Sequence, residues 1–216
     1  MSATRYDIRE ASFEEFVAFL FAHAVAPSSE NPWYRHAEVH YDPQRIASYY
    51  IRLFRAPRLL RDRFSAAELE QGFWAIQGGV LECSVRNVIW DRTVPFDVRA
   101  DSVKSMSDLY AELFVEESLD TSSNMWWDSL AYDWHCGNRA RANGGEDRSM
   151  QDVMFATLGR ILDMPSETCQ RAALHGLGHL HHPDTDDLVQ SYLARNPSIA
   201  PDLREYALAA AQFRVL

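Results

Sequence analysis

Apolar residues recur at intervals of three and four along most of the chain, which is the spacing of a helix with one buried face. Ile46, Tyr50 and Leu53 form one such stripe, and a longer one runs through residues 98–114. Residues 80–90 carry β-branched side chains that also suit a strand, but the same spacing favours a helix there. The pattern therefore predicts an all-α fold.

Several of these helices have recognisable start signals. A serine followed three residues later by glutamate, the capping-box pattern, occurs at 12–15 and again at 65–68. Asp42 precedes Pro43, which suits an N-cap followed by proline at the first helical position. The segment 27–41 is polar and contains a proline, and we predict that it is a long surface connection.

The C-terminal third has the most regular pattern. Four helices are expected at 150–162, 167–180, 185–194 and 201–213, joined by short segments that each contain a proline. Short connections make neighbouring helices antiparallel, and stacked antiparallel pairs build an α-solenoid. We predict one helical domain over residues 1–216, with a mobile loop at the Gly- and Asn-rich segment 138–147.

Part of this region resembles a known repeat family. Residues 172–180, followed by His182-Pro183, resemble the first helix of a HEAT repeat, residues 188–193 the second, and residues 203–208 the start of another unit. The chain also resembles an uncharacterised bacterial family that shares the elements 71–74, 125–128 and 175–182. The resemblance implies an irregular HEAT-like α-solenoid and supplies no activity.

Charge and cysteine content limit the kinds of binding partner and the cellular compartment that we expect. The chain has 21 basic and 31 acidic residues, a net charge of −10, which argues against nucleic acid and anionic membranes and suits a basic protein partner. No apolar run reaches the roughly 18 residues of a membrane span. The three cysteines are far apart in sequence and form no CxxC pair, and the N-terminus lacks the apolar core of a signal peptide. We therefore expect a cytoplasmic protein.

Two histidines have a spacing that is typical of metal ligands. His175 and His179 are four residues apart, so both rings project from one helical face, as in HExxH zinc enzymes. However, Gly176 stands where that motif has its glutamate, and the aspartates of 184–187 offer no fixed third ligand. The chain also lacks the His-Glu dyads of HEAT-like di-iron hydroxylases. We therefore predict no metal and no cofactor, and place both histidines in an interhelical groove.

Tryptophans suggest a second candidate site. On a helix Trp126 and Trp134 share one face, whereas Trp127 lies about 100° around the axis, so one of the adjacent pair is expected to line a groove or an interface. Nearby aspartates would accept hydrogen bonds from a basic ligand. The predicted binding residues are Trp126, Trp127, Asp128, Asp133, Trp134, His135, His175 and His179.

These observations favour binding over catalysis. No GxSxG motif is present, and Cys136 beside His135 is not a dyad because helical neighbours diverge. We predict a non-enzymatic interaction module, such as a bacterial immunity or adaptor protein, that binds a basic protein through an acidic, tryptophan-containing surface. Three alternatives stay open: a metal-dependent hydrolase or oxygenase that uses His175 and His179, a HEAT-like DNA glycosylase that uses the arginines of 45–63, and a structural subunit whose exposed tryptophan surface forms a homodimer. The sequence gives no oligomeric state.

Overall fold

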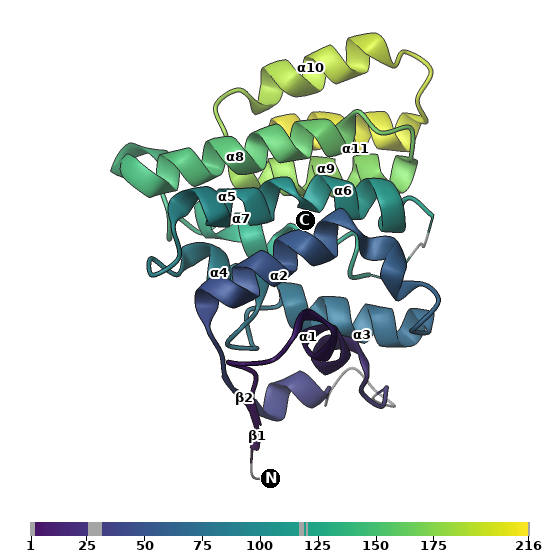
Figure 1. Cartoon of the computed structure of the whole chain (residues 1–216). Helices are drawn as coiled ribbons and strands as arrows, with labels where there is room; N and C mark the ends of the chain where they lie inside the picture. The colour runs from purple at the N-terminus through teal and green to yellow at the C-terminus, as the bar shows by residue number, and fades with distance from the viewer. Residues whose placement is uncertain (1–2, 26–31, 117–118, 120, 216) are drawn as a thin grey trace. The chain divides into compact units, whose positions relative to one another are not determined.

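The computed structural model describes residues 3–25, 32–116, 119 and 121–215, which are mostly helical (Figure 1). The all-α prediction is therefore confirmed. The chain divides into two compact units, one formed by residues 1–113 with 119–122 and the other by 114–118 with 123–216. That these units make up a single domain stays a prediction.

The first unit contains a short two-stranded sheet and helices packed around α2. Its elements, in chain order, are β1 (Thr4–Asp7), α1 (Phe13–Phe21), a 3-10 turn (Trp33–His36), β2 (Ala37–His40), α2 (Pro43–Arg55), a second 3-10 turn (Pro57–Leu60), α3 (Ala66–Gln77), α4 (Val85–Trp90), α5 (Phe96–Lys104), α6 (Met106–Leu109) and a π-helical turn (Tyr110–Phe114) whose last residue is assigned to the second unit. Helix α2 contacts α1, α4, α5 and α6, so its apolar stripe lies in the core.

The predicted helix starts of this unit are confirmed. The Ser12 hydroxyl accepts a hydrogen bond from the backbone N–H of Glu15, whose carboxylate accepts one from the backbone N–H of Ser12 at 2.8 Å. The box at 65–68 has the same two contacts. Asp42 caps α2 by accepting from the backbone N–H of Arg45 at 2.8 Å. These side chains satisfy backbone donors that the first helical turn leaves unpaired.

Three expectations for this unit need correction. The connection predicted at 27–41 contains β2, which pairs in parallel with β1 from Thr4↔Ala37 to Asp7↔His40, while 27–31 lie outside the described residues. The strands are too short and too exposed to leave an alternating pattern. Within 80–90 the helix begins only at Val85, capped by Ser84. The stripe at 98–114 belongs to two helices and a π-helical turn, separated at Ser105, rather than to one helix.

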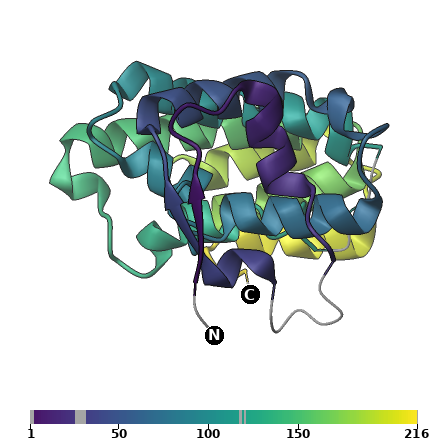
Figure 2. The ribbon, with the colours of Figure 1, turned by 60° about the horizontal axis from the view of Figure 1, so that its bottom comes forward.

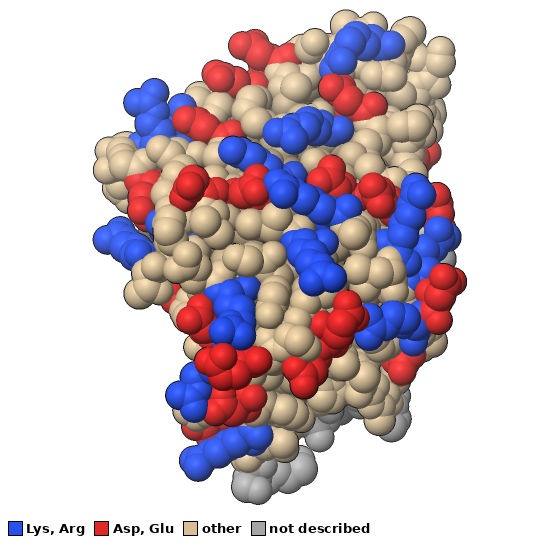
Figure 3. Space-filling model, viewed as in Figure 1, with Lys and Arg blue, Asp and Glu red and all other residues tan. Residues whose placement is uncertain are grey.

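Several arginines of 45–63, on which the DNA-glycosylase alternative depends, are matched by acidic side chains. Ion pairs join Arg45 to Glu10, Arg55 to Asp101, and Arg63 to Glu14. Figure 3 shows basic and acidic side chains interspersed over the face in view. Such an arrangement lowers the local positive potential that a phosphate backbone requires. Among the described residues, no helix combines the length and apolarity needed to cross a bilayer.

The second unit is a set of helices packed around α9. Its elements are α7 (Asp128–His135), a 3-10 turn (Arg141–Asn143), α8 (Gly145–Leu162), α9 (Glu167–Leu180), α10 (Thr185–Arg195) and α11 (Pro201–Ala211). Helix α9 contacts α7, α8 and α11, and α10 contacts α8 and α11 (Figures 1 and 2). The pairs α8–α9 and α10–α11 thus stack on each other, which is compatible with a helical repeat.

The four helices predicted for this unit are confirmed with small changes at their ends. Helix α9 has the predicted bounds, whereas α10 ends one residue later and α11 two residues earlier than expected. Helix α8 begins at Gly145, five residues before the predicted start. Residues 145–147 are therefore helical, although they were predicted to belong to the mobile loop at 138–147.

Candidate metal centre

Helix α9 presents His175 and His179 one turn apart on the same face. The helix begins after Ser166, whose hydroxyl accepts from the backbone N–H of Cys169, and its residues 172–180 are all buried. The two imidazole side chains are only 6% and 5% exposed. Two polar rings held this deeply need partners inside the unit, because an unpaired buried polar group is costly.

The partner that both rings share is Asp128, the first residue of α7. A Cβ added to Gly176 would lie 2.7 Å from the Trp127 Cβ and 2.7 Å from the Leu158 Cδ2, so only glycine fits at this contact. The absence of a side chain at Gly176 lets the start of α7 lie directly against α9. This close approach places the Asp128 carboxylate beside the two histidines.

Three ligand atoms converge at this point. The Asp128 Oδ1 lies 3.1 Å from the His175 Nε2 and 3.0 Å from the His179 Nε2, and the two nitrogens are 3.2 Å apart. Among the described residues this is the only group of three or more His, Cys, Asp or Glu side chains whose ligand atoms converge as a metal site requires. The atoms form a nearly equilateral triangle of one carboxylate oxygen and two imidazole nitrogens.

Protons can satisfy two sides of this triangle. An imidazole nitrogen is either an N–H donor or a lone-pair acceptor, and an ionised carboxylate only accepts. If both nitrogens carry a proton, each donates to the Asp128 Oδ1, and the 3.2 Å approach of the two nitrogens is a contact without a hydrogen bond. A cation held by all three atoms would take the place of these two protons.

The triangle has dimensions that suit a transition-metal ion. Ligands around tetrahedral zinc, with bonds of about 2.0 Å, lie about 3.3 Å apart, and neighbouring ligands of an octahedral ion with bonds of about 2.1 Å lie about 3.0 Å apart. The observed separations of 3.0, 3.1 and 3.2 Å lie between these values. Two imidazoles with one carboxylate are a ligand set used by zinc and by non-haem iron.

Residues around the triangle hold its rings in place. The Nδ1 of His175 is 2.7 Å from the hydroxyl of Tyr206 on α11, the kind of second contact that orients a metal-binding imidazole. The Nδ1 of His179 is buried without a hydrogen-bond partner. The ring of His179 is held instead by edge contacts with Tyr132 and His135, with centroids 5.2 and 5.1 Å away.

The electrostatics of the cluster favour an ionised carboxylate. Hydrogen bonds from His175 and His179 hold the pKa of Asp128 well below its ordinary value. Burial, together with the charge of Asp128, raises the pKa of Tyr206, so its hydroxyl stays protonated at neutral pH. The Asp128 side chain is 39% exposed, whereas both histidines are buried, so solvent can approach the cluster on its carboxylate side.

The structure brings together only some of the residues predicted as a binding site. Asp128, His175 and His179 form the triangle, and His135 contacts it through the ring of His179. One of Trp126 and Trp127 was expected to line a groove or an interface, but both are fully buried, and Trp134 is 5% exposed. Asp133 is buried and pairs with Arg139, so it offers little to an external ligand.

The third ligand also differs from the candidates at 184–187. Asp184 lies beside His182, and the carboxylate that meets His175 and His179 is Asp128, 47 residues before His175. Asp128 was predicted only as an acceptor for a basic ligand. Tyr206 was missed entirely, because a single tyrosine on a later helix leaves no spacing signal.

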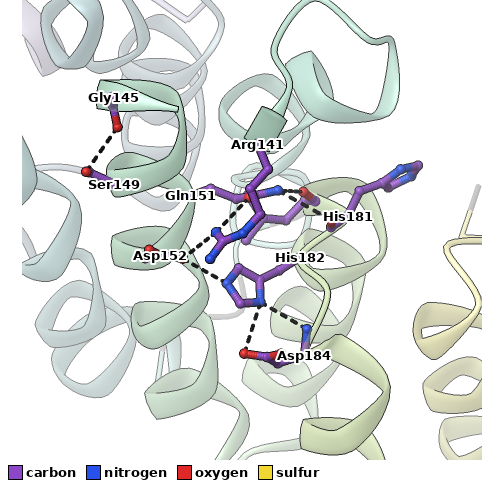
Figure 4. A network of polar contacts seen from close by, with 9 residues as sticks. Arg141, Gly145, Ser149, Gln151, Asp152, His181, His182 and Asp184 are labelled. Atoms are coloured by element: carbon purple, nitrogen blue, oxygen red, sulfur yellow. Dashed lines mark hydrogen bonds and ion pairs between the residues drawn. The ribbon is translucent and has the colours of Figure 1, made fainter. Parts of the chain in front are cut away.

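A separate polar network lies at the C-terminal end of α9 (Figure 4). The Nε2 of His182 is 3.0 Å from the Asp152 Oδ1, its Nδ1 accepts from the backbone N–H of Asp184, and its ring stacks on Phe155. Gln151 donates to the backbone carbonyl of Leu180 at 2.8 Å. This network gives hydrogen-bond partners to backbone carbonyls at the end of α9 and links that end to α8.

Comparisons with models of known protein families, with curated proteins and with solved structures found no match to this chain.

Proposed function

We propose that this protein is a hydrolase that binds one divalent transition-metal ion through Asp128, His175 and His179 and uses this ion in catalysis. The observation that carries the proposal is the convergence of three ligand atoms 3.0 to 3.2 Å apart, which are the separations expected between neighbouring ligands of a transition-metal ion. Catalytic zinc sites keep three protein ligands and leave further positions for water and substrate. The part-exposed carboxylate side of the cluster would provide that access.

The chain's own residues have distinct tasks in this proposal. Asp128 contributes the negative charge that two neutral imidazoles lack, and its low pKa keeps that charge at neutral pH. Tyr206 fixes the orientation of the His175 ring. The ion would lower the pKa of a bound water and supply a hydroxide nucleophile. Because both histidines are buried, water and substrate would reach the ion from the exposed side of Asp128.

Oxygen activation is a second candidate, because the same ligand set holds iron in non-haem oxygenases. The ligand separations do not distinguish the two, since they lie between tetrahedral and octahedral values. Bound zinc together with zinc-dependent hydrolysis supports the hydrolase. Tight binding of Fe(II), with oxygen consumption and no hydrolysis, would support the oxygenase instead.

The interaction module predicted from sequence is retained as a proposal with weaker support. Its expected aromatic anchors, Trp126 and Trp127, are buried. The net charge of −10 still suits a basic protein partner. The nucleic-acid alternative loses its main argument because arginines of 45–63 pair with acidic side chains.

The test compares hydrolysis of chromogenic ester, phosphodiester and peptide substrates by the metal-free chain and by the chain loaded with Zn²⁺ or Mn²⁺. We expect activity only with metal, and Asp128→Asn should lower it at least a hundredfold. Asp152→Asn is the matched control, because Asp152 also contacts a buried histidine but belongs to no triangle. Equal effects of the two substitutions, or no metal-dependent hydrolysis, would contradict the proposed hydrolase.

A further inference from the structure

Two further histidines lie close to the triangle, next to His179. His135, the last residue of α7, and His181, the residue that follows α9, bring their Nδ1 and Nε2 atoms to 3.2 Å from each other. The ring of His135 also lies across that of His179, with centroids 5.1 Å apart and planes at 88°. Neither His135 nor His181 belongs to the three-residue cluster. The proposed hydrolase leaves this pair without a role.

The backbone of His181 is held in an unusual conformation. Its φ of 53° lies in the left-handed region, where a helix end normally carries glycine because a Cβ is unfavourable there. Gln151 donates to the carbonyls of Leu180 and His181, and the adjacent His182 is anchored to Asp152. Figure 4 shows the ring of His181 directed away from this network. The network thus fixes the backbone while the imidazole reaches outward.

The other ring of the pair is also fixed before any ligand arrives. His135 stacks on Tyr132, with centroids 5.1 Å apart and planes at 16°, and it is exposed to solvent. His181 stacks on Phe213 at 4.5 Å. Both imidazoles are therefore oriented by aromatic neighbours, and one of them is open to solvent. Such pre-organisation lowers the entropy that a ligand must overcome on binding.

We propose that His135 Nδ1 and His181 Nε2 bind a second divalent transition-metal ion beside the first centre. A nitrogen separation of 3.2 Å matches neighbouring ligands of such an ion, and imidazole favours zinc, copper and nickel. In the metal-free chain one nitrogen donates its proton to the other, so on metal binding that proton moves to the second nitrogen of its own ring and both imidazoles bind in the neutral form. Water completes the coordination.

This second ion binds more weakly than the first. The pair supplies two neutral ligands and no carboxylate, whereas the triangle includes the ionised Asp128. An ion already held at the triangle would also repel a second one of the same charge. The proposal does not depend on hydrolysis, because it concerns occupancy of the pair alone.

The test is a titration of the metal-free, untagged chain with Zn²⁺ against a chromophoric chelator. We expect two ions per chain, the second bound at least tenfold more weakly. The double substitution His135→Gln with His181→Asn should remove the weaker ion, and asparagine is chosen because it tolerates the left-handed conformation. The tight ion should stay bound, because all three of its ligands are kept and Tyr132 still packs against the His179 ring. His135→Gln alone should weaken the second ion at least tenfold. It changes only an exposed side chain, so the fold should be kept.

Two controls separate the possible outcomes. His40→Gln removes an exposed histidine of β2, in the other unit, and should leave both ions in place. His175→Ala should remove the tight ion and keep the weak one, so failure of the first centre can be distinguished from failure of the second. A wild-type chain that binds a single ion would overturn the proposal. So would retention of both ions by the double variant, or loss of the weak ion in His40→Gln.

Discussion

At the scale of single residues, the candidate centre depends on where a few polar atoms point. Asp128, His175 and His179 direct three ligand atoms at one position, and this convergence is what separates them from the other buried polar groups of the unit. His182 shows the contrast: both its nitrogens have an ordinary partner, so protons satisfy it completely. A buried histidine therefore points to a metal site only when its ring nitrogen converges with other ligand atoms on one position.

The contact between Tyr206 and His175 gives a prediction at this scale. Tyr206→Phe removes the hydroxyl that lies 2.7 Å from the His175 Nδ1, so the ring loses its orienting partner. We expect the affinity for Zn²⁺ to fall by about ten- to a hundredfold, as measured by competition with a chelator. Tyr192→Phe is the control, since that hydroxyl donates to Gln170 away from the centre. Unchanged affinity in Tyr206→Phe would exclude the orienting role.

At the scale of elements, the site depends on how closely α7 and α9 pack. Gly176 and Gly178 lie within one turn of α9, and the atoms nearest to them belong to side chains of other segments. At Gly176 the neighbours are the Trp127 Cβ and Leu158, and at Gly178 the neighbour is Val215. Because Trp127 precedes Asp128, the packing at Gly176 also fixes the position of the carboxylate.

Gly176→Ala tests this packing. The added Cβ would meet the Trp127 Cβ at 2.7 Å, an atom that moves only with its backbone. We expect a loss of about 1–3 kcal/mol in the free energy of unfolding and weaker metal binding. Gly159→Ala in α8 is the matched control: its Cβ would meet Leu188 at 3.7 Å, so it should stabilise by about 0.5–1 kcal/mol. Denaturant unfolding of both variants measures the change in the free energy of unfolding that each substitution causes. A change of the same sign in both variants would contradict the packing argument.

The elements were predictable from sequence to different degrees. Periodicity and capping residues located α1, α2 and α3 and the last four helices, because these signals are local. Strands β1 and β2 were missed because each has four residues, mostly exposed, and they pair across 33 positions. In the same way, the i, i+4 spacing identified His175 and His179, but Asp128 joins them only through packing between separate helices.

At the scale of the whole molecule, every residue of both proposed metal sites belongs to the second compact unit. The sequence-based choice of a binding module depended on charge and on the expected exposure of tryptophans. Net charge carries no information about where three side chains meet. Burial of both adjacent tryptophans could not be inferred either, since it depends on partners such as Phe114, Gly176 and Leu158.

The most direct test of the central claim is the metal content of the untagged protein purified without chelators, measured by mass spectrometry. The wild-type chain should retain about one tightly bound transition-metal ion per chain after dialysis, as expected for a three-ligand site. The double variant His175→Ala with His179→Ala should retain none while keeping its helical circular dichroism. A wild-type chain that cannot hold a transition metal, even after reloading, or a double variant that keeps the same ion, would contradict the assignment of the centre.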